Sequence, residues 1–306
     1  MIFFKNNWIN FHFNLDPSQK QRQSKWDVFC YSTSLTNFKF GSFQEEMEKT
    51  CEEIFISTQR LGTKLGLFLS GGLDSEIIAR TLLKMGIPFD SYFIVFHNQL
   101  NQHERDIVDT FQNQTGHRVN YIDVDIEKWL QSANHLEYYA KTYRTFDMAT
   151  PLQMWARTKI SKGHSMISGL FEPHLHRVVA GESCQLEWFH AVDESSVCSR
   201  MKFIEKNFYS DFPFFYLYRP QLYAAYCFDP HVQSMLSNPY KLSLVSTKKI
   251  MMKHYFPEME ERPKYTGFEN VKELCGNVMK NITHEFVDGQ LRIPHRDFER
   301  LFTHAS

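Results

Sequence analysis

The chain has 306 residues, a length that suits one large domain or two modest ones with a substantial core. Its 34 basic and 35 acidic residues give a net charge of −1, so it lacks the overall positive charge that favours nucleic acid as a partner. Its six cysteines include no C-x-x-C pair, which argues against a zinc ribbon or a disulfide framework and indicates reduced thiols in a cytoplasmic protein.

The N-terminal residues 1–43 are predicted to form a short β-rich extension. Apolar and polar residues alternate in "WINFHFNL" and again in "WDVFCYSTS", and a polar turn separates these segments. The start of the chain is not typical of a secretory signal, because polar residues interrupt it. A charged helix with apolar residues at helical spacing is expected next, with Ser42 as its N-cap. The remaining residues, 44–306, are expected to form one larger domain.

Strands and helices alternate in the first part of this domain, up to about residue 170. Four short apolar segments are typical of buried strands: residues 66–70, 89–98, 118–125 and 164–169. Helical patterns occupy the stretches between them, so the order predicts a parallel sheet with right-handed crossovers, a Rossmann-like α/β core. Ligands of such sheets bind at the carboxyl ends of the strands. Three polar loops fall there: residues 70–75, 96–98 and 123–125.

The C-terminal part, residues 171–306, is predicted to be mainly helical with aromatic-rich loops. Its most apolar run, residues 212–228, is interrupted by Arg219 and Pro220 and is too short to span a membrane. We therefore expect no membrane association. The run is expected to be a buried aromatic part of the core, with a partner-binding surface as the alternative.

The most informative stretch is the turn between the first core strand and its helix, which reads S-G-G-L-D-S over residues 70–75. Its two glycines allow a sharp bend, and the N-terminus of the following helix presents N–H groups that suit an anion. The P-loop motif would need a Lys followed by Ser or Thr, and the dinucleotide motif G-x-G-x-x-G is absent. The turn therefore predicts a phosphate site of another type, with an ordinary glycine-rich turn as the alternative.

This S-G-G-x-D-S pattern resembles the signature of the N-type ATP pyrophosphatases, the PP-loop enzymes of the adenine nucleotide α-hydrolase type. Two further pieces resemble the synthetase domain of the asparagine synthetases, in matching order over about residues 42–270. The first is the strand ending Ser168-Gly169. The second is an R-P-K-x-x-G-F motif made of Arg262, Pro263, Lys264, Gly267 and Phe268. The glutaminase domain of that family is not expected, because residue 2 is Ile2 rather than a catalytic Cys and the N-terminal extension is far too short.

The resemblance implies an ATP-dependent, AMP-forming carbon–nitrogen ligase that uses Mg²⁺. It would adenylate a carboxylate on a small molecule or peptide and transfer the acyl group to ammonia or an amine, which a partner protein could supply. The implied nucleotide-binding residues are Leu67, Leu69, Ser70, Gly71, Gly72, Leu73, Asp74, Ser75, Val95, Phe96, Ser168 and Gly169. The implied metal ligands are Asp74 and Glu172, with Asp125 as a further carboxylate. Lys264 is the implied catalytic cation and Lys248 a secondary one, and a surface lysine is the alternative for each.

Several alternatives stay open. The chain could be another N-type pyrophosphatase, of the tRNA-modifying or NAD-synthetase type. It could also be a nucleotide-binding protein that has lost catalysis, because the loop after Gly169 lacks most of the family's acidic residues. Glu172, His174 and His176 alternate along the chain and could ligate a transition metal. The charged segment 103–106 is expected to be a solvated helix face. Residues 1–43 could cap the site, bind a partner or mediate homo-oligomer formation.

Overall fold

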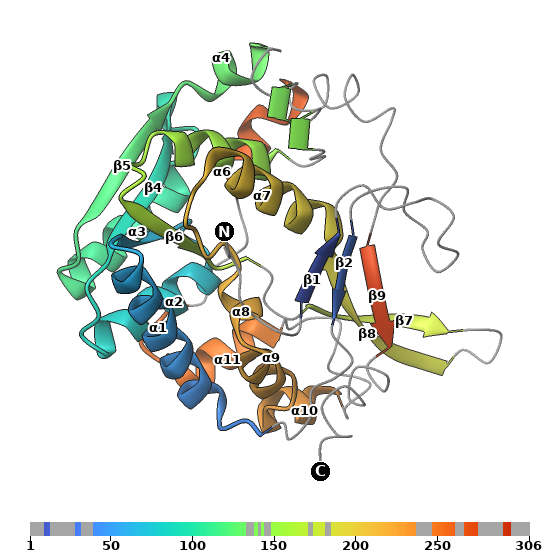
Figure 1. Cartoon of the computed structure of the whole chain (residues 1–306). Coiled ribbons are helices and arrows are strands. Elements are labelled where there is room, and N and C mark those ends of the chain that lie inside the picture. The colour runs from blue at the N-terminus through green and yellow to red at the C-terminus, as the bar shows by residue number, and fades with distance from the viewer. Residues whose placement is uncertain are drawn as a thin grey trace.

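The computed structural model describes residues 9–12, 28–31, 39–132, 138–139, 142–143, 148–170, 174–180, 185–236, 247–260, 266–274 and 290–294. The core contains a parallel sheet of four strands in the order β5-β4-β3-β6, and its strands β5, β4 and β6 are labelled in Figure 1. These strands are β3 (Lys64–Phe68), β4 (Asp90–Phe96), β5 (Val119–Val124) and β6 (His164–Ser168). The predicted Rossmann-like α/β core is confirmed. Because the strands are parallel, their carboxyl ends share one edge of the sheet.

Both faces of this sheet pack against helices. Along β4, Phe93 and Val95 pack into one cluster of buried residues, whereas Ile94 and Phe96 pack into another. Side chains alternate across a strand, so the two clusters lie on opposite faces. The first cluster includes apolar residues of α1 (Phe43–Arg60), α2 (Leu73–Lys84) and α3 (Gln102–Thr115). The second includes residues of α4 (Ile126–Gln131) and α6 (Ala149–Thr158).

The start of the α/β core is set by a helix cap. Ser42 is the N-cap of α1, and its Oγ accepts a hydrogen bond from the Glu45 backbone N–H at 3.3 Å. The Glu45 carboxylate in turn accepts from the Ser42 backbone N–H at 2.8 Å, which completes a capping box. The predicted N-cap is therefore confirmed. Ahead of it, β1 (Ile9–His12) and β2 (Val28–Tyr31) pair antiparallel, in agreement with the predicted short N-terminal strands.

The C-terminal part contains the predicted helices and also a sheet that the sequence did not predict. The helices are α7 (Glu194–Asn207), α8 (Phe215–Tyr218), α9 (Pro220–Cys227), α10 (Pro230–Leu236), α11 (Thr247–Tyr255) and the 3-10 helix η2 (Gly267–Val271). The sheet is antiparallel, in the order β7-β8-β9 (Figure 1). Its strands are β7 (His174–Ala180), β8 (Gln185–Asp193) and β9 (Gln290–Pro294).

The aromatic run 212–228 is part of the core, as predicted. Its tyrosines Tyr216, Tyr223 and Tyr226 are among the largest fully buried side chains. Tyr216 and Tyr226 pack in the same cluster as α1 and α2. Within the described ranges, none of the helices combines the length and the apolar composition needed to cross a membrane.

Candidate functional site

The turn after β3, which we call the 70–75 loop, leads from a buried strand to the N-terminus of α2. Gly71 has a φ of 71°, in the left-handed region that glycine adopts without strain. Gly72 is the N-cap residue, and no side chain of the described residues caps this end of α2. Leu73 begins the helix and is buried in the core. The first-turn N–H groups of α2 therefore face the loop, an arrangement that favours binding of an anion.

Two serine hydroxyls shape this loop. Ser75 Oγ accepts from the Ser70 backbone N–H at 3.1 Å and donates to the Gly72 carbonyl oxygen at 3.1 Å. Because a hydroxyl has one proton, Ser70 is the donor in the 3.2 Å contact between the two serine Oγ atoms. Ser75 is buried and Ser70 is exposed. Ser75 thus stabilises the loop from inside, while Ser70 lies where a ligand can reach it.

Gly169 brings the end of β6 against the start of α2. Ser168 pairs with Phe68 of the neighbouring strand β3, so Gly169 follows directly at the carboxyl edge of the sheet. A Cβ on Gly169 would lie 2.6 Å from Ser75 N and 2.8 Å from the carbonyl carbon of Asp74, which no real side chain tolerates. The hydroxyl of Ser168 donates to the Pro213 carbonyl oxygen at 2.5 Å. Of this predicted pair, Gly169 therefore contacts the loop and Ser168 has a structural partner.

Lys248 reaches the loop from α11, far along the chain. Its Nζ donates to Asp74 Oδ2 at 2.5 Å, and the two side chains are only 22% and 17% exposed. Met251 and Met252, three and four residues after Lys248, share its helix face and are buried in the cluster that contains α2. This packing directs Lys248 to the N-terminus of α2. The lysine that the sequence ranks second thus lies beside the predicted metal ligand Asp74.

A second group of residues lies at the carboxyl end of β4. Asn101 accepts from the Phe96 backbone N–H and donates to the Ile94 carbonyl oxygen, both at 2.8 Å. The Glu104 carboxylate accepts from the Gly267 backbone N–H at 3.3 Å. Burial raises the pKa of Glu104 to about 7, although its hydrogen bonds from Gly267 and Asn101 act in the opposite direction. The expectation that segment 103–106 is a solvated helix face is therefore wrong for Glu104.

The predicted adenine contacts are core residues. Leu67 and Leu69 are 0% and 2% exposed, and Val95 and Phe96 are 8% and 4% exposed. Leu67, Leu69 and Val95 pack in the cluster of α1 and α2, while Phe96 packs on the other face of the sheet. The structure brings none of these four side chains to an exposed surface. Of the four, Leu69 directly precedes the 70–75 loop in the chain.

Asp125, His174 and His176 belong to elements other than the 70–75 loop. Lys264 and Glu172 lie outside the described residues. Asp125 caps α4. Its Oδ1 accepts a hydrogen bond from the Lys128 backbone N–H at 3.1 Å, and this bond lowers the pKa of the Asp125 carboxyl. It follows β5, which β4 separates from β3. His174 and His176 lie on β7. The described ranges contain no group of three or more His, Cys, Asp or Glu residues that could hold a metal.

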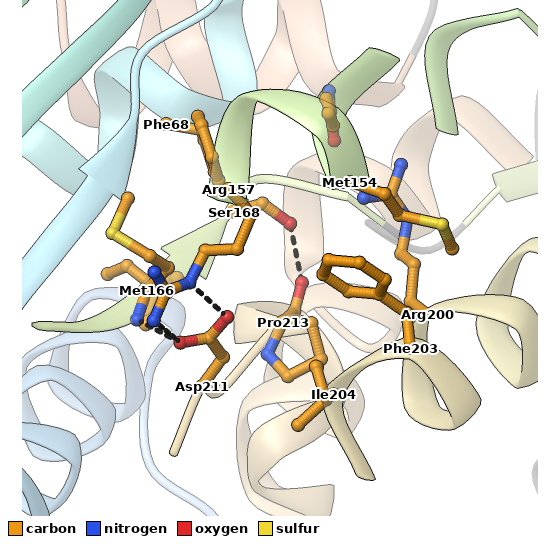
Figure 2. A pocket seen from close by; sticks show the side chains of 12 residues that line it. Phe68, Met154, Arg157, Met166, Ser168, Arg200, Phe203, Ile204, Asp211 and Pro213 are labelled. Atoms are coloured by element: carbon orange, nitrogen blue, oxygen red, sulfur yellow. Dashed lines mark hydrogen bonds and ion pairs between the residues drawn. The ribbon is translucent and has the colours of Figure 1, made fainter. Parts of the chain in front are cut away.

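A small cavity lies between β6, α6 and α7 (Figure 2). Its volume is about 30 Å³, enough for about two water molecules and far too small for a nucleotide. Two of its charged groups pair with each other: Arg157 Nε and Nη2 donate to the two carboxylate oxygens of Asp211 at 2.7 and 2.9 Å, while Arg200 donates to Thr150 Oγ1. Figure 2 shows this pair below the hydrogen bond from Ser168 to Pro213. The cavity therefore belongs to the packing of the core.

Two features of the site escape sequence reasoning. Lys248 and Asp74 were both named from the sequence, but their contact depends on how α11 packs against α2. The burial of Glu104 has no local signal, since it depends on contact with Gly267 from the far end of the chain. In comparisons with protein-family models and with curated proteins, nothing matches this chain.

Proposed function

We propose that the chain is an ATP-dependent, AMP-forming ligase that joins a carboxylate to ammonia or an amine. The observation that supports this most is the pairing of Lys248 with Asp74 at the N-terminus of α2. A cation, a carboxylate and a glycine turn meet at the carboxyl ends of parallel strands, where α/β folds bind nucleotide phosphates. The S-G-G-L-D-S and R-P-K-x-x-G-F motifs, which resemble those of asparagine synthetases, specify the type of reaction.

In the proposed reaction, a carboxylate oxygen of the acyl substrate attacks the α-phosphorus of ATP. The bond from that phosphorus to the oxygen bridging the α and β phosphates breaks, so pyrophosphate leaves and an acyl-adenylate forms. The nitrogen of ammonia or an amine then attacks the acyl carbon, loses a proton and displaces AMP. Adenylation is needed because a free carboxylate offers the nitrogen no good leaving group.

The residues of the loop would bind the departing pyrophosphate. The first-turn N–H groups of α2 and the exposed Ser70 hydroxyl are donors for phosphate oxygens. Lys248 Nζ would exchange its contact with Asp74 for a phosphate oxygen and neutralise negative charge as it builds up. Loss of one such donor costs about 2.7 to 4 kcal/mol of transition-state stabilisation, which is about 100- to 1,000-fold in rate. Lys264 stays a prediction as the second cation.

The donor set at the loop suits Mg²⁺. The Asp74 carboxylate already accepts a cationic group, and Mg²⁺ in nucleotide sites is held by one or two carboxylates together with phosphate oxygens. When bound, Mg²⁺ would offset charge on the pyrophosphate. We assign Asp74 as its protein ligand, and Glu172 stays a prediction.

Turnover with ATP, Mg²⁺ and a panel of amino acids, peptides and amines tests this proposal. We expect AMP and pyrophosphate in equal amounts, and a loss of about 100-fold or more for Lys248→Met and Asp74→Asn. Lys253→Met is the matched control, because Lys253 is exposed on the same helix and should be dispensable. ATP binding without AMP formation across the panel would instead support a nucleotide-binding protein without catalysis. Absence of any heat in a titration with Mg²⁺ and ATP would refute both.

A further inference from the structure

The first turn of α3 packs against the glycine turn of the 70–75 loop. A Cβ on Gly71 would lie 3.0 Å from the Glu104 carbonyl oxygen and 3.3 Å from its Cβ, whereas ordinary contact begins at 3.4 Å. Gly71 also has a φ of 71°, a conformation that residues with a side chain rarely adopt. The turn that would hold phosphate groups is therefore shaped on one side by Glu104.

The start of α3 is fixed to the end of β4 by a buried amide. Asn101 is the N-cap residue of α3 and is 3% exposed. Its side chain accepts from the Phe96 backbone N–H and donates to the Ile94 carbonyl oxygen, both at 2.8 Å. Asn101 Nδ2 also lies 3.5 Å from Glu104 Oε2. The side chain of Glu104 thus belongs to the network that holds this end of the helix.

The carboxylate of Glu104 also contacts η2, which comes from the far end of the chain. Its Oε2 accepts from the backbone N–H of Gly267, the first residue of η2, at 3.3 Å. Phe268 packs its ring on Phe96 with a centroid distance of 5.5 Å, and Val271 is buried in the same cluster as Phe96. Packing therefore holds η2 at the carboxyl end of β4, and Glu104 links it to α3.

From these contacts we propose that Glu104 is a positioning residue that couples the docking of η2 to the phosphate-binding conformation of the 70–75 loop. One residue makes both contacts, its backbone with Gly71 and its carboxylate with Gly267, so a displacement of η2 is passed to the glycine turn. This inference rests on the proposed function, because it takes nucleotide phosphates to bind at the loop. Coupling of this kind is reciprocal: nucleotide binding and docking of η2 stabilise each other by the same factor.

The acidity of Glu104 suits a position beside an anion site. Burial raises the pKa of its carboxyl to about 7, and repulsion from the Glu269 carboxylate acts in the same direction. Near neutral pH a large share of the molecules therefore carry a protonated Glu104, which brings no negative charge to the phosphate site. Glutamine has the shape of this neutral form and keeps an oxygen that accepts from Gly267, so it is the conservative replacement.

Amide exchange at Gly267, followed by NMR with and without Mg²⁺ and ATP, tests the coupling. In the wild type we expect saturating nucleotide to slow this exchange at least fivefold. Glu104→Ala removes the acceptor, so exchange should be at least tenfold faster without nucleotide, and nucleotide should change it less than twofold. Glu104→Gln should stay within twofold of wild type. Asp106→Asn is the control, because Asp106 is exposed on the same helix and its carboxylate accepts locally from Gln102.

Calorimetric titration with Mg²⁺ and ATP tests the same coupling from the loop. Glu104→Ala should weaken the affinity at least fivefold, and Glu104→Gln should restore it to within twofold of wild type. Gly267→Ala acts from the side of η2, because its Cβ would lie 2.4 Å from Asn101 Cβ, and it should weaken the affinity at least fivefold as well. The double variant should lose no more than twofold beyond Glu104→Ala, since both changes break one contact. Gly267→Ala decides the coupling through the same two measurements if Glu104→Ala fails to fold.

The outcomes separate this inference from the proposed function. Nucleotide that binds the wild type but leaves exchange at Gly267 unchanged would overturn the coupling and leave the proposed function intact. Equal losses of affinity in the alanine and glutamine variants, or additive losses in the double variant, would do the same. Wild-type protein that gives no heat with Mg²⁺ and ATP would refute the proposed function and this inference together.

Discussion

Replacing Gly169 by alanine tests how the 70–75 loop is held in place. The added Cβ would lie 2.6 Å from Ser75 N, whereas ordinary contact begins at 3.4 Å, so the two elements must separate by about 0.8 Å. The nearest atoms belong to the backbone of Asp74 and Ser75 and cannot swing aside. Overpacking of this kind lowers the free energy of unfolding by about 1 to 3 kcal/mol. A displacement near 1 Å at a reacting site can also lower turnover by about 100-fold.

Gly163→Ala is the matched control, at the other end of β6. Its Cβ would meet only Ser161 Oγ at 3.4 Å, so the free energy of unfolding should change by no more than about 0.5 kcal/mol. Urea unfolding and calorimetric titration with Mg²⁺ and ATP measure both variants. We expect Gly169→Ala to lose stability and at least tenfold in affinity while Gly163→Ala keeps both. Equal stability and equal affinity in the two variants would refute the close approach of β6 to α2.

Three other predictions concern buried hydrogen bonds. Ser75→Ala removes bonds inside the 70–75 loop, so urea unfolding should show a loss of about 1 to 3 kcal/mol and calorimetry a weaker affinity for ATP. Asp211→Asn leaves the buried Arg157 without its charge partner, so the free energy of unfolding measured in urea should fall by about 3 to 5 kcal/mol. A fall below about 1 kcal/mol would contradict the importance of this ion pair. Glu104 keeps its proton up to about pH 7 in the folded protein but loses it near its ordinary value of 4.5 when unfolded, so stability should fall as the pH rises between these values. The difference is about 3 kcal/mol, and unfolding curves of Glu104→Gln should lack this fall.

Local patterns were enough to predict the core. The apolar strands, the intervening helices and the N-cap Ser42 depend on neighbours in sequence, and the parallel sheet follows from their alternation. The pairing of β9 in the antiparallel sheet β7-β8-β9 has no such signal. Strand β9 is separated from β8 by all the C-terminal helices, so its pairing depends on tertiary structure.

The site was predictable in part for the same reason. The 70–75 loop is a continuous motif, so its turn, its glycines and the helix after it could be expected from six residues. The contact of Lys248 with Asp74 depends on how α11 packs, and the burial of Glu104 depends on the docking of η2. The predicted adenine contacts illustrate the opposite difficulty. An apolar strand residue such as Leu67 has the same sequence pattern whether it packs in the core or contacts a ligand.

The origin of Lys248 in α11 has a consequence for synthesis of the protein. Asp74 leaves the ribosome long before Lys248 does, and α11 adds Met251 and Met252 to the same buried cluster as α2. A nascent chain that ends before α11 therefore carries the glycine turn without its lysine and leaves apolar surface of α1 and α2 uncovered. Under the proposed function, the ability to hold a triphosphate would arise late in translation, together with the completed core, and unfinished chains would not consume nucleotide.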